Sequence, residues 1–233
     1  FTFNGKKLFG YEGDTIASAL IANGIHLVGR SFKYHRPRGF FGAGVEEPNA
    51  KLQVEFNGHS EPNVNATEME LVEGLSATSQ NCWPSVNFDI GAINNFLKMF
   101  FPAGFYYKTF MWPKSFWYKI YEPFIRKAAG LGVASIEKDK ERYEHKFEYC
   151  DLLVTGSGPS GLASAYAAAK NGAKVILAED KPRFGGTLLT DDVSIDNLSG
   201  KDWAEKIITE LKSMPNVTVK NRSQVFGYYD HNM

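Results

Sequence analysis

The sequence predicts two fold classes in succession, an α+β domain followed by an α/β domain. Residues 1–74 show short strands, tight turns and a single helix. Residues 149–233 begin with an apolar strand, a glycine-rich turn and an Ala-rich helix, which is the start of a parallel sheet. Residues 75–148 have a different, aromatic-rich composition, so we expect them to connect the two domains.

Composition limits the classes of partner. The 233 residues are 43% apolar, which is enough for one or two cores. Because 26 basic residues balance 26 acidic ones, no net charge attracts nucleic acid or an anionic membrane. No run of 18 apolar residues predicts a membrane span. We therefore expect a cytoplasmic protein that binds neither nucleic acid nor membrane.

Neither the cysteines nor the histidines form a recognisable site. Cys82 and Cys150 lie far apart and match no metal-ligand spacing, so we expect free thiols and no metal site. The histidines show neither metal spacing nor pairing with a nucleophile. No catalytic residue is therefore predicted in this chain, and the histidines are expected to be structural or solvated. They are His26, His35, His59, His145 and His231.

Two dipeptides in residues 1–74 indicate hairpin turns. Asn4-Gly5 separates apolar residues 1–3 from residues 8–11, and Asn57-Gly58 separates a strand at 51–56 from one at 67–72. Asp14 is expected to cap a helix that ends at Asn23, where Gly24 permits a left-handed stop. A small mixed sheet with one helix is typical of a β-grasp domain.

Aromatic residues dominate the segment from Leu75 to Gly130, which contains three of the four tryptophans. Prolines divide it into short pieces. So many aromatic side chains predict a segment that wraps another domain or subunit. Packing within this chain alone is the alternative. The charged stretch 134–145 is expected to be a linker, with a domain boundary near Tyr149.

A glycine-rich turn follows the strand at 151–155 and leads into the helix at 162–171. Its first glycine permits a tight turn, its second allows a pyrophosphate to approach the backbone, and its third lets helix and strand pack closely. The helix N-terminus then offers amides to phosphates. The residues are Gly156, Ser157, Gly158, Pro159, Ser160 and Gly161.

An acid and a second glycine pair complete the expected cofactor site. Glu179 ends a strand at 174–178, eighteen residues past Gly161, where a carboxylate can accept from ribose hydroxyls and favour NAD or FAD over NADP. The loop that follows is expected to fold back over the cofactor, although its cations weaken the preference against NADP. Its candidate residues are Asp180, Lys181, Arg183, Gly185, Gly186 and Thr187.

The acid, short spacer and glycine pair resemble the two-dinucleotide-binding flavoprotein superfamily. A helix at 202–214 and a strand at 217–220 follow, so residues 149–233 predict the first βαβ units of a Rossmann-like FAD/NAD(P)-binding domain. The sequence stops before such a domain could close. We therefore expect a piece of a longer polypeptide.

Three further features resemble one family. These are the basic loop from Arg30 to Arg38, the cysteine-free stretch Gly44-Val45-Glu46-Glu47-Pro48-Asn49, and the aromatic run from Phe105 to Lys114. In ferredoxin-like β-grasp domains a two-iron cluster loop occurs at this point, with closely spaced cysteines. Together with the glycine turn, the whole chain resembles the N-terminal part of the α subunits of heterotetrameric sarcosine oxidases, with no iron-sulfur cluster.

The resemblance implies an enzyme that oxidatively demethylates sarcosine to glycine. Oxygen is the acceptor, hydrogen peroxide is formed, and tetrahydrofolate captures the carbon as 5,10-methylenetetrahydrofolate. It implies NAD in this chain, FAD and FMN in or shared with a β subunit, and folate in a later part of α. The partners implied are β, γ and δ subunits. This chain would supply the NAD site and a subunit interface.

Several alternatives remain open. The chain could belong to a related amine, opine or cyanide-forming oxidase, or be a scaffold whose nucleotide is structural. A disulfide reductase is disfavoured because no cysteine follows Cys150. A basic cluster could meet a flavin phosphate or a partner's acidic surface, unless Glu46 and Glu47 neutralise it. The cluster is Arg30, Lys33, His35, Arg36 and Arg38.

Overall fold

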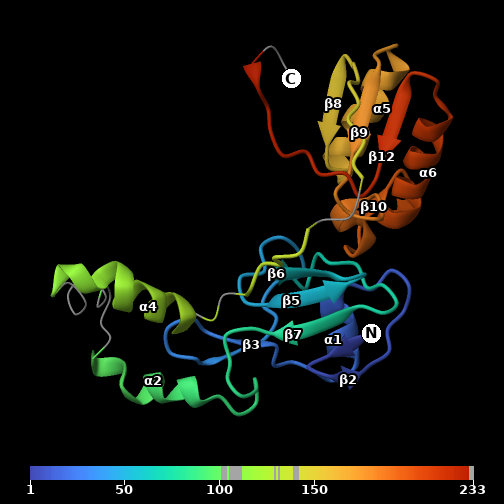
Figure 1. The fold of residues 1–233 in the computed structure, drawn as a ribbon. Coiled ribbons are helices and arrows are strands. Elements are labelled where there is room, and N and C mark those ends of the chain that lie inside the picture. Colours follow the sequence, from blue (N-terminus) through green and yellow to red (C-terminus); the bar gives the residue numbers. More distant parts are fainter. Residues whose placement is uncertain (101–103, 105–111, 129, 131, 139–141, 231–233) are drawn as a thin grey trace. The chain divides into compact units, whose positions relative to one another are not determined.

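The computed structural model describes residues 1–100, 104, 112–128, 130, 132–138 and 142–230. These divide into two compact units, Phe1–Glu141 and Arg142–Met233, called the first and second unit (Figure 1). Most of the aromatic run from Phe105 to Lys114, and also His231, lie outside the described residues.

A mixed five-stranded sheet forms the centre of the first unit, with strand order β2-β1-β7-β5-β6 (Figure 1). β1 pairs in parallel with β7, and the other neighbours are antiparallel. A mixed sheet with one helix confirms the α+β class expected for the start of the chain. The strands are β1 (Thr2–Phe3), β2 (Lys6–Lys7), β5 (Lys51–Phe56), β6 (His59–Asn65) and β7 (Ser76–Ser79).

Both expected hairpin turns are present. Asn4 and Gly5 have φ values of 49° and 78°, and Asn57 and Gly58 have 50° and 80°. Two consecutive left-handed residues match the right-handed twist of the joined strands. The strand expected at 51–56 is confirmed as β5, whereas the first hairpin is shorter than expected because Leu8 leaves the sheet and enters the core.

The strand expected at 67–72 is wrong. The amides of Glu68 and Met69 both donate to the carbonyl of Asn65, which turns the chain immediately after β6. A single bridge then pairs Thr15 with Glu70 at the start of the helix. The strand that completes the sheet is β7, so the sheet continues past residue 74.

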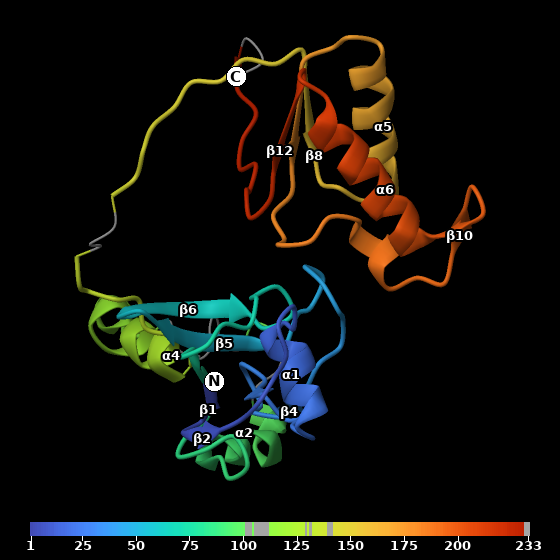
Figure 2. The same cartoon turned by 90° about the vertical axis from the view of Figure 1, so that its right-hand side faces the viewer.

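Helix α1 (Ile16–Ala22) covers one face of this sheet (Figure 2). Its N-cap is Thr15, which forms a capping box with Ser18, so the cap expected at Asp14 is wrong. Asp14 instead accepts from the Ser18 hydroxyl at 2.7 Å. The helix ends at Asn23, and Gly24 at φ 74° supplies the expected stop.

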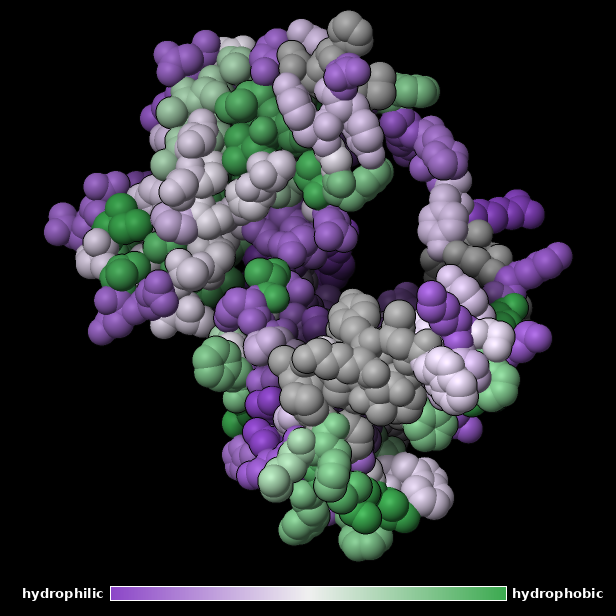
Figure 3. All heavy atoms as spheres, turned by 90° about the vertical axis from the view of Figure 1, so that its left-hand side faces the viewer, coloured by the Kyte–Doolittle hydropathy of each residue, from purple (hydrophilic) through white to green (hydrophobic). Residues whose placement is uncertain are grey.

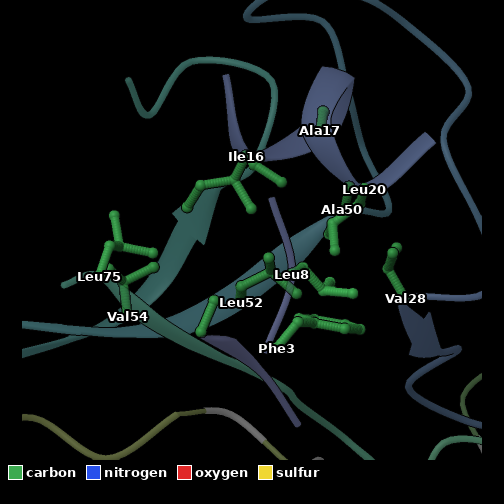
Figure 4. Close-up of a cluster of buried hydrophobic side chains, with 12 residues drawn as sticks. Phe3, Leu8, Ile16, Ala17, Leu20, Val28, Ala50, Leu52, Val54 and Leu75 are labelled. Carbon is green, nitrogen blue, oxygen red and sulfur yellow. The ribbon is translucent and has the colours of Figure 1, made fainter. Parts of the chain in front are cut away.

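The core of the first unit lies between α1 and the sheet. Figure 4 shows Ile16 and Leu20 of the helix directed toward Leu52 and Phe3 of the strands. Ile16, Leu20 and Leu52 are completely buried. Burying each such side chain contributes about 1.5–3 kcal/mol. Ala50 and Ala66, in the loops that follow β4 (Pro37–Arg38) and β6, belong to the same buried core.

Several short helices follow β7 in the first unit. They are η1 (Ile90–Ala92), α2 (Ile93–Phe96), η2 (Lys98–Phe100), η3 (Lys114–Phe116), η4 (Trp117–Tyr121) and α4 (Glu122–Ala128). Figure 3 shows apolar side chains gathered on the surface around α2. Phe96 is 84% exposed and Met99 87% exposed, so this part of the segment is not packed within the first unit. No described helix is both long and apolar enough to cross a membrane.

The second unit is a three-stranded parallel sheet of order β12-β9-β8, with α5 and α6 on the same face (Figure 2). This arrangement confirms the α/β class. The strand expected at 217–220 is confirmed as β12. The elements are β8 (Leu152–Thr155), α5 (Pro159–Lys170), β9 (Val175–Ala178), η5 (Gly186–Leu189), β10 (Ser194–Ile195), β11 (Leu198–Ser199), α6 (Gly200–Ser213) and β12 (Val217–Lys220).

Leu162, Val175, Leu177 and Leu211 are fully buried between the two helices and the sheet of the second unit. They hold α5 close to β8 and β9, so the loops at the carboxyl ends of both strands start from fixed positions. Ligands of open α/β sheets bind outside this edge. The edge is therefore where a site is expected, and all candidate cofactor residues follow β8 or β9 in sequence.

Candidate functional site

The three glycines of the turn between β8 and α5 have different steric environments. Gly156 has φ 85°, which favours glycine. A Cβ at Gly161 would lie 2.0 Å from the carbonyl oxygen of Gly156, so only glycine lets helix and strand come this close. A Cβ at Gly158 would meet nothing within 4 Å. Packing within the chain therefore does not require glycine at residue 158. Because Gly158 has no side chain, there is open space beside its backbone.

Helix α5 begins at this turn with Gly158 as N-cap and Pro159 as its first residue. Pro159 is favoured there because it has no amide hydrogen to leave unpaired. The first amides of a helix have no intrahelical partners, and its dipole makes this end positive. The open space beside Gly158 therefore adjoins a surface that favours an anion such as a phosphate.

Ser157 connects the turn to the end of β9. Its amide donates to Glu179 Oε2 at 2.7 Å, and its hydroxyl donates to the same oxygen. Its own carbonyl and Oγ both accept from the Gly185 amide, each at 3.1 Å. Ser157 is completely buried, so its hydroxyl acts inside the structure. Ser157 was predicted as a cofactor contact, and that prediction stays untested. Its bonds to Glu179 and Gly185 were not predicted, because sequence spacing shows only a variable residue between two glycines.

Glu179 is 5% exposed. Burial alone would raise the pKa of Glu179, but hydrogen bonds with Asp180, with the Ser157 side chain and with the amides of Ser157 and Lys181 outweigh burial and lower it. The hydrogen bond with Glu179, followed by burial, raises the pKa of Asp180. Glu179 is therefore the member of the pair that stays ionised and able to accept hydrogen bonds.

Only part of the Glu179 carboxylate remains for a ligand. A carboxylate offers about four acceptor positions. The Ser157 amide and hydroxyl use two on Oε2, and the Lys181 amide uses one on Oε1 at 3.1 Å. Asp180 also forms a hydrogen bond with this carboxylate, so a ligand hydroxyl group would bind in the place of the Asp180 side chain.

The glycine pair folds back onto the first turn. Gly185 and Gly186 have φ values of 125° and 54°. A Cβ at Gly186 would lie 3.0 Å from the Cα of Gly158, so the two loops are in close contact. Together with Ser157 and Glu179, these residues form one connected group, defined here as the glycine-turn site.

Other candidates lie at the edge of this site or away from it. Asp180 is bonded to Glu179, and exposed Thr187 lies in the first turn of η5. Arg183 instead lines a cavity against α6, together with Lys201 and Lys212. The Asn221 side chain, which was not predicted, donates to the Pro182 carbonyl at 3.0 Å and holds this loop.

The basic cluster of the first unit is bound largely within its own chain. Arg30 donates to the Val86 carbonyl at 2.8 and 2.6 Å, and His35 Nδ1 lies 2.7 Å from Asp89 Oδ2. These bonds join the loop between β3 (Gly29–Arg30) and β4 (Pro37–Arg38) to the segment after β7. Glu47, expected to neutralise the cluster, directs its carboxylate at amides of its own loop.

A parallel half-sheet with a glycine turn after its first strand defines the class of dinucleotide-binding domains. Residues 151–221 match the family described as "FAD dependent oxidoreductase", and residues 1–82 match "2Fe-2S iron-sulfur cluster binding domain". A solved structure of L-proline dehydrogenase from P. horikoshii aligns with 99% of this chain and 34% of its own, with a TM-score of 0.56 and 18% identity. That likeness concerns the fold alone.

The chain is similar along its whole length to sarcosine oxidase subunit alpha. It is 57% identical to that protein of Rhizobium meliloti (strain 1021) over 233 residues, which cover 100% of this chain and 24% of the relative. It is 32% identical to that of Corynebacterium sp. (strain U-96), over 99% of this chain and 19% of the relative. The chain thus spans about a quarter or less of the length of these relatives.

Proposed function

We propose that this chain is the N-terminal part of the α subunit of a sarcosine oxidase and that its glycine-turn site binds the adenosine pyrophosphate part of NAD. One observation carries the binding proposal: Gly158 borders open space, while its neighbours Gly161 and Gly186 lie against the backbone of the same site. A glycine with no packing reason of its own is what a closely approaching pyrophosphate requires.

Each part of the site has a role in this proposal. The α5 N-terminus and the backbone at Gly158 hold the phosphates, and the Glu179 carboxylate accepts from a ribose hydroxyl that replaces its hydrogen bond with Asp180. A carboxylate at this position disfavours a 2′-phosphate, which argues for NAD over NADP. The bound nucleotide supplies hydride chemistry or serves as a resident ligand. The residues of this chain bind and orient it.

The wider activity is proposed from similarity. The relatives named sarcosine oxidase subunit alpha support an α subunit of an oxidase that acts on sarcosine. We propose that the whole enzyme oxidatively demethylates sarcosine to glycine, with hydrogen peroxide and 5,10-methylenetetrahydrofolate as further products. Flavin chemistry with FAD and FMN belongs to a β-type partner, and folate binding to a later part of the polypeptide. We infer a ferredoxin-type β-grasp domain for residues 1–82, supported by the family match and by the parallel pairing of β1 with β7.

The aromatic segment after β7 is the proposed interface to the β-, γ- and δ-type subunits or to later domains. Phe88, Phe96, Met99 and Phe100 are each more than two-thirds exposed. Aromatic residues and methionine are enriched at protein interfaces, and apolar patches of this kind are seldom left in water. The proposal therefore assigns this surface to assembly.

A test uses the full-length enzyme purified with its partner subunits. Nucleotides released by denaturation are identified by mass spectrometry, and sarcosine-dependent hydrogen peroxide is measured on the intact enzyme. NAD together with sarcosine-dependent peroxide would support the proposal. An intact complex that contains no nucleotide, or that produces no hydrogen peroxide from sarcosine, would contradict it.

FAD is the second candidate for the glycine-turn site. The specific observation in its favour is the match of residues 151–221 to the FAD-dependent oxidoreductase family. Both nucleotides share the adenosine pyrophosphate that the site would hold. The Gly158→Val variant separates them, because the nucleotide whose stoichiometry falls in the purified variant is the one bound at this turn.

A further inference from the structure

A buried carboxylate lies at the centre of the loop between β4 and β5. Glu47 is 1% exposed. Its Oε2 accepts from the amides of Phe41 and Gly42 at 2.5 and 2.6 Å, and its Oε1 accepts from those of Asn49 and Ala50 at 2.7 and 3.2 Å. The loop thus directs four backbone amides, from both of its ends, at one acidic group.

These bonds explain why the carboxylate is ionised although it is buried. Burial alone would raise the pKa of Glu47, but the four backbone hydrogen bonds outweigh burial and lower it. The loop is closed on its other side by the Thr67 hydroxyl, which donates to the Gly44 carbonyl at 2.8 Å. Within the described part of the chain these four amides are the donors to the Glu47 carboxylate, and each of the hydrogen bonds is charge-assisted.

The match of residues 1–82 to the family described as "2Fe-2S iron-sulfur cluster binding domain" suggests a different anion for the first unit, namely an iron-sulfur cluster. A two-iron cluster is held by four cysteine thiolates, and convergent backbone amides commonly surround such clusters. This sequence has two cysteines, Cys82 and Cys150, and neither lies between β4 and β5. Among the described residues, no group of three or more His, Cys, Asp or Glu side chains could hold a metal ion. The residues present therefore do not fit an iron-sulfur cluster.

We infer that Glu47 is an internal anion that organises this loop in place of an iron-sulfur cluster, so that the first unit folds without metal. The argument is one of donor balance. Backbone amides that converge on a buried point are costly unless an acceptor is present. With the thiolates lost, the Glu47 carboxylate supplies that acceptor from within the chain.

A carboxylate-bound cation is not compatible with the same geometry. Each carboxylate oxygen has about two acceptor positions. Both oxygens of Glu47 already accept two amides each, so none remains for a metal ion. The neighbouring Glu46 differs, because it is exposed, and its Oε1 accepts from the amides of Ala43 and Gly44 at 2.9 and 3.0 Å.

The first experiment measures metal content. The full-length protein is purified from cells supplied with iron and sulfide, and iron and acid-labile sulfide are quantified. We expect neither above the buffer blank, together with a cooperative unfolding transition of the first unit. Iron and sulfide in stoichiometric amounts, lost together with that transition on chelation, would overturn the inference.

The second experiment compares Glu47→Gln with Glu46→Gln in the same protein, by native-state amide hydrogen exchange. Removing the charge of Glu47 should speed exchange at Phe41, Gly42, Asn49 and Ala50 by about ten- to a hundred-fold, since each amide loses a charged acceptor. Glu46→Gln should leave these four amides within about two-fold of wild type.

Unchanged protection of the four amides in Glu47→Gln would refute the role of the carboxylate. Equal loss of protection in both glutamate variants would do the same, because it would show a general weakness of the loop. Glu47→Asp covers the case in which Glu47→Gln does not fold. Its charge is retained on a shorter side chain, so it should recover the fold with intermediate protection. A Glu47→Asp protein that also fails to fold would count against the inference.

Discussion

Two glycine-to-alanine substitutions in the turn after β8 separate nucleotide binding from folding. At Gly158 a Cβ has no neighbour within 4 Å, and φ is −63°, which any residue adopts. Alanine is a poorer N-cap than glycine, but it lowers the entropy of the unfolded chain, so the two effects nearly cancel. We expect the free energy of unfolding of Gly158→Ala to stay within about 0.5 kcal/mol of wild type.

Nucleotide binding by Gly158→Ala should be weakened, although its free energy of unfolding is unchanged. The added methyl group fills the space beside the backbone that the pyrophosphate needs. A cost similar to that of overpacking a protein core, about 1–3 kcal/mol, weakens binding about five- to a hundred-fold. Gly158→Ala should therefore be a well-folded protein that is purified with little nucleotide.

Gly161→Ala should instead fold into a less stable second unit. Its Cβ would lie 2.0 Å from the carbonyl oxygen of Gly156, which is backbone and cannot rotate away. The strain should cost about 3 kcal/mol and lower the unfolding midpoint of the second unit by on the order of ten degrees.

Calorimetry of the nucleotide-free full-length proteins gives the unfolding midpoints, and isothermal titration with NAD gives the affinities. Wild-type affinity in Gly158→Ala would refute the proposed position of the pyrophosphate. A midpoint for Gly161→Ala equal to that of wild type would refute the close packing of α5 on β8.

Three further outcomes follow from individual contacts. Ser157→Ala should destabilise the second unit by about 1–3 kcal/mol, because Glu179 loses a buried donor. It should also speed amide hydrogen exchange at Gly185, whose amide loses the Ser157 Oγ as an acceptor; unchanged exchange would contradict this. The pKa of Glu47 is lower in the folded protein than its unfolded value of about 4.3. Ionised Glu47 therefore adds to the free energy of unfolding above about pH 5, and this stabilisation is lost as the pH falls. Denaturant unfolding measured from pH 7 to pH 3 should therefore show a steeper fall in the free energy of unfolding for wild type than for Glu47→Gln. The same pH dependence in both proteins would exclude this stabilisation by Glu47. Gly58→Ala, at φ 80°, should cost about 1 kcal/mol in the same melts, and no change would argue against the two-residue turn.

Local chemistry allowed several elements to be predicted. The two Asn-Gly turns were expected because few other residue pairs adopt consecutive positive φ values. β5 and β12 were found at their predicted bounds, because each is a short apolar or alternating run between clear turn signals. The different requirements at Gly156 and Gly161 also followed from sequence spacing, and the contacts agree with them.

The errors occurred where a distant contact decided between local alternatives. Residues 67–72 have the composition of a strand, but hydrogen bonds to the start of α1 capture them, and the sheet takes β7 instead. Asp14 and Thr15 are both good caps, and packing of Ile16 into the core selected Thr15.

The sequence by itself determined the order of the two domains, the glycine turn and the absence of cysteines from the loop between β4 and β5, because these depend on residue type and short spacing. Only the tertiary structure decided which groups share donors and acceptors. It joined Ser157 to Glu179 and Gly185 across 22 and 28 residues, and it turned Glu47 inward to four amides. The physical reason is that a buried polar group must find a partner, and the fold alone determines which partners come within hydrogen-bonding distance.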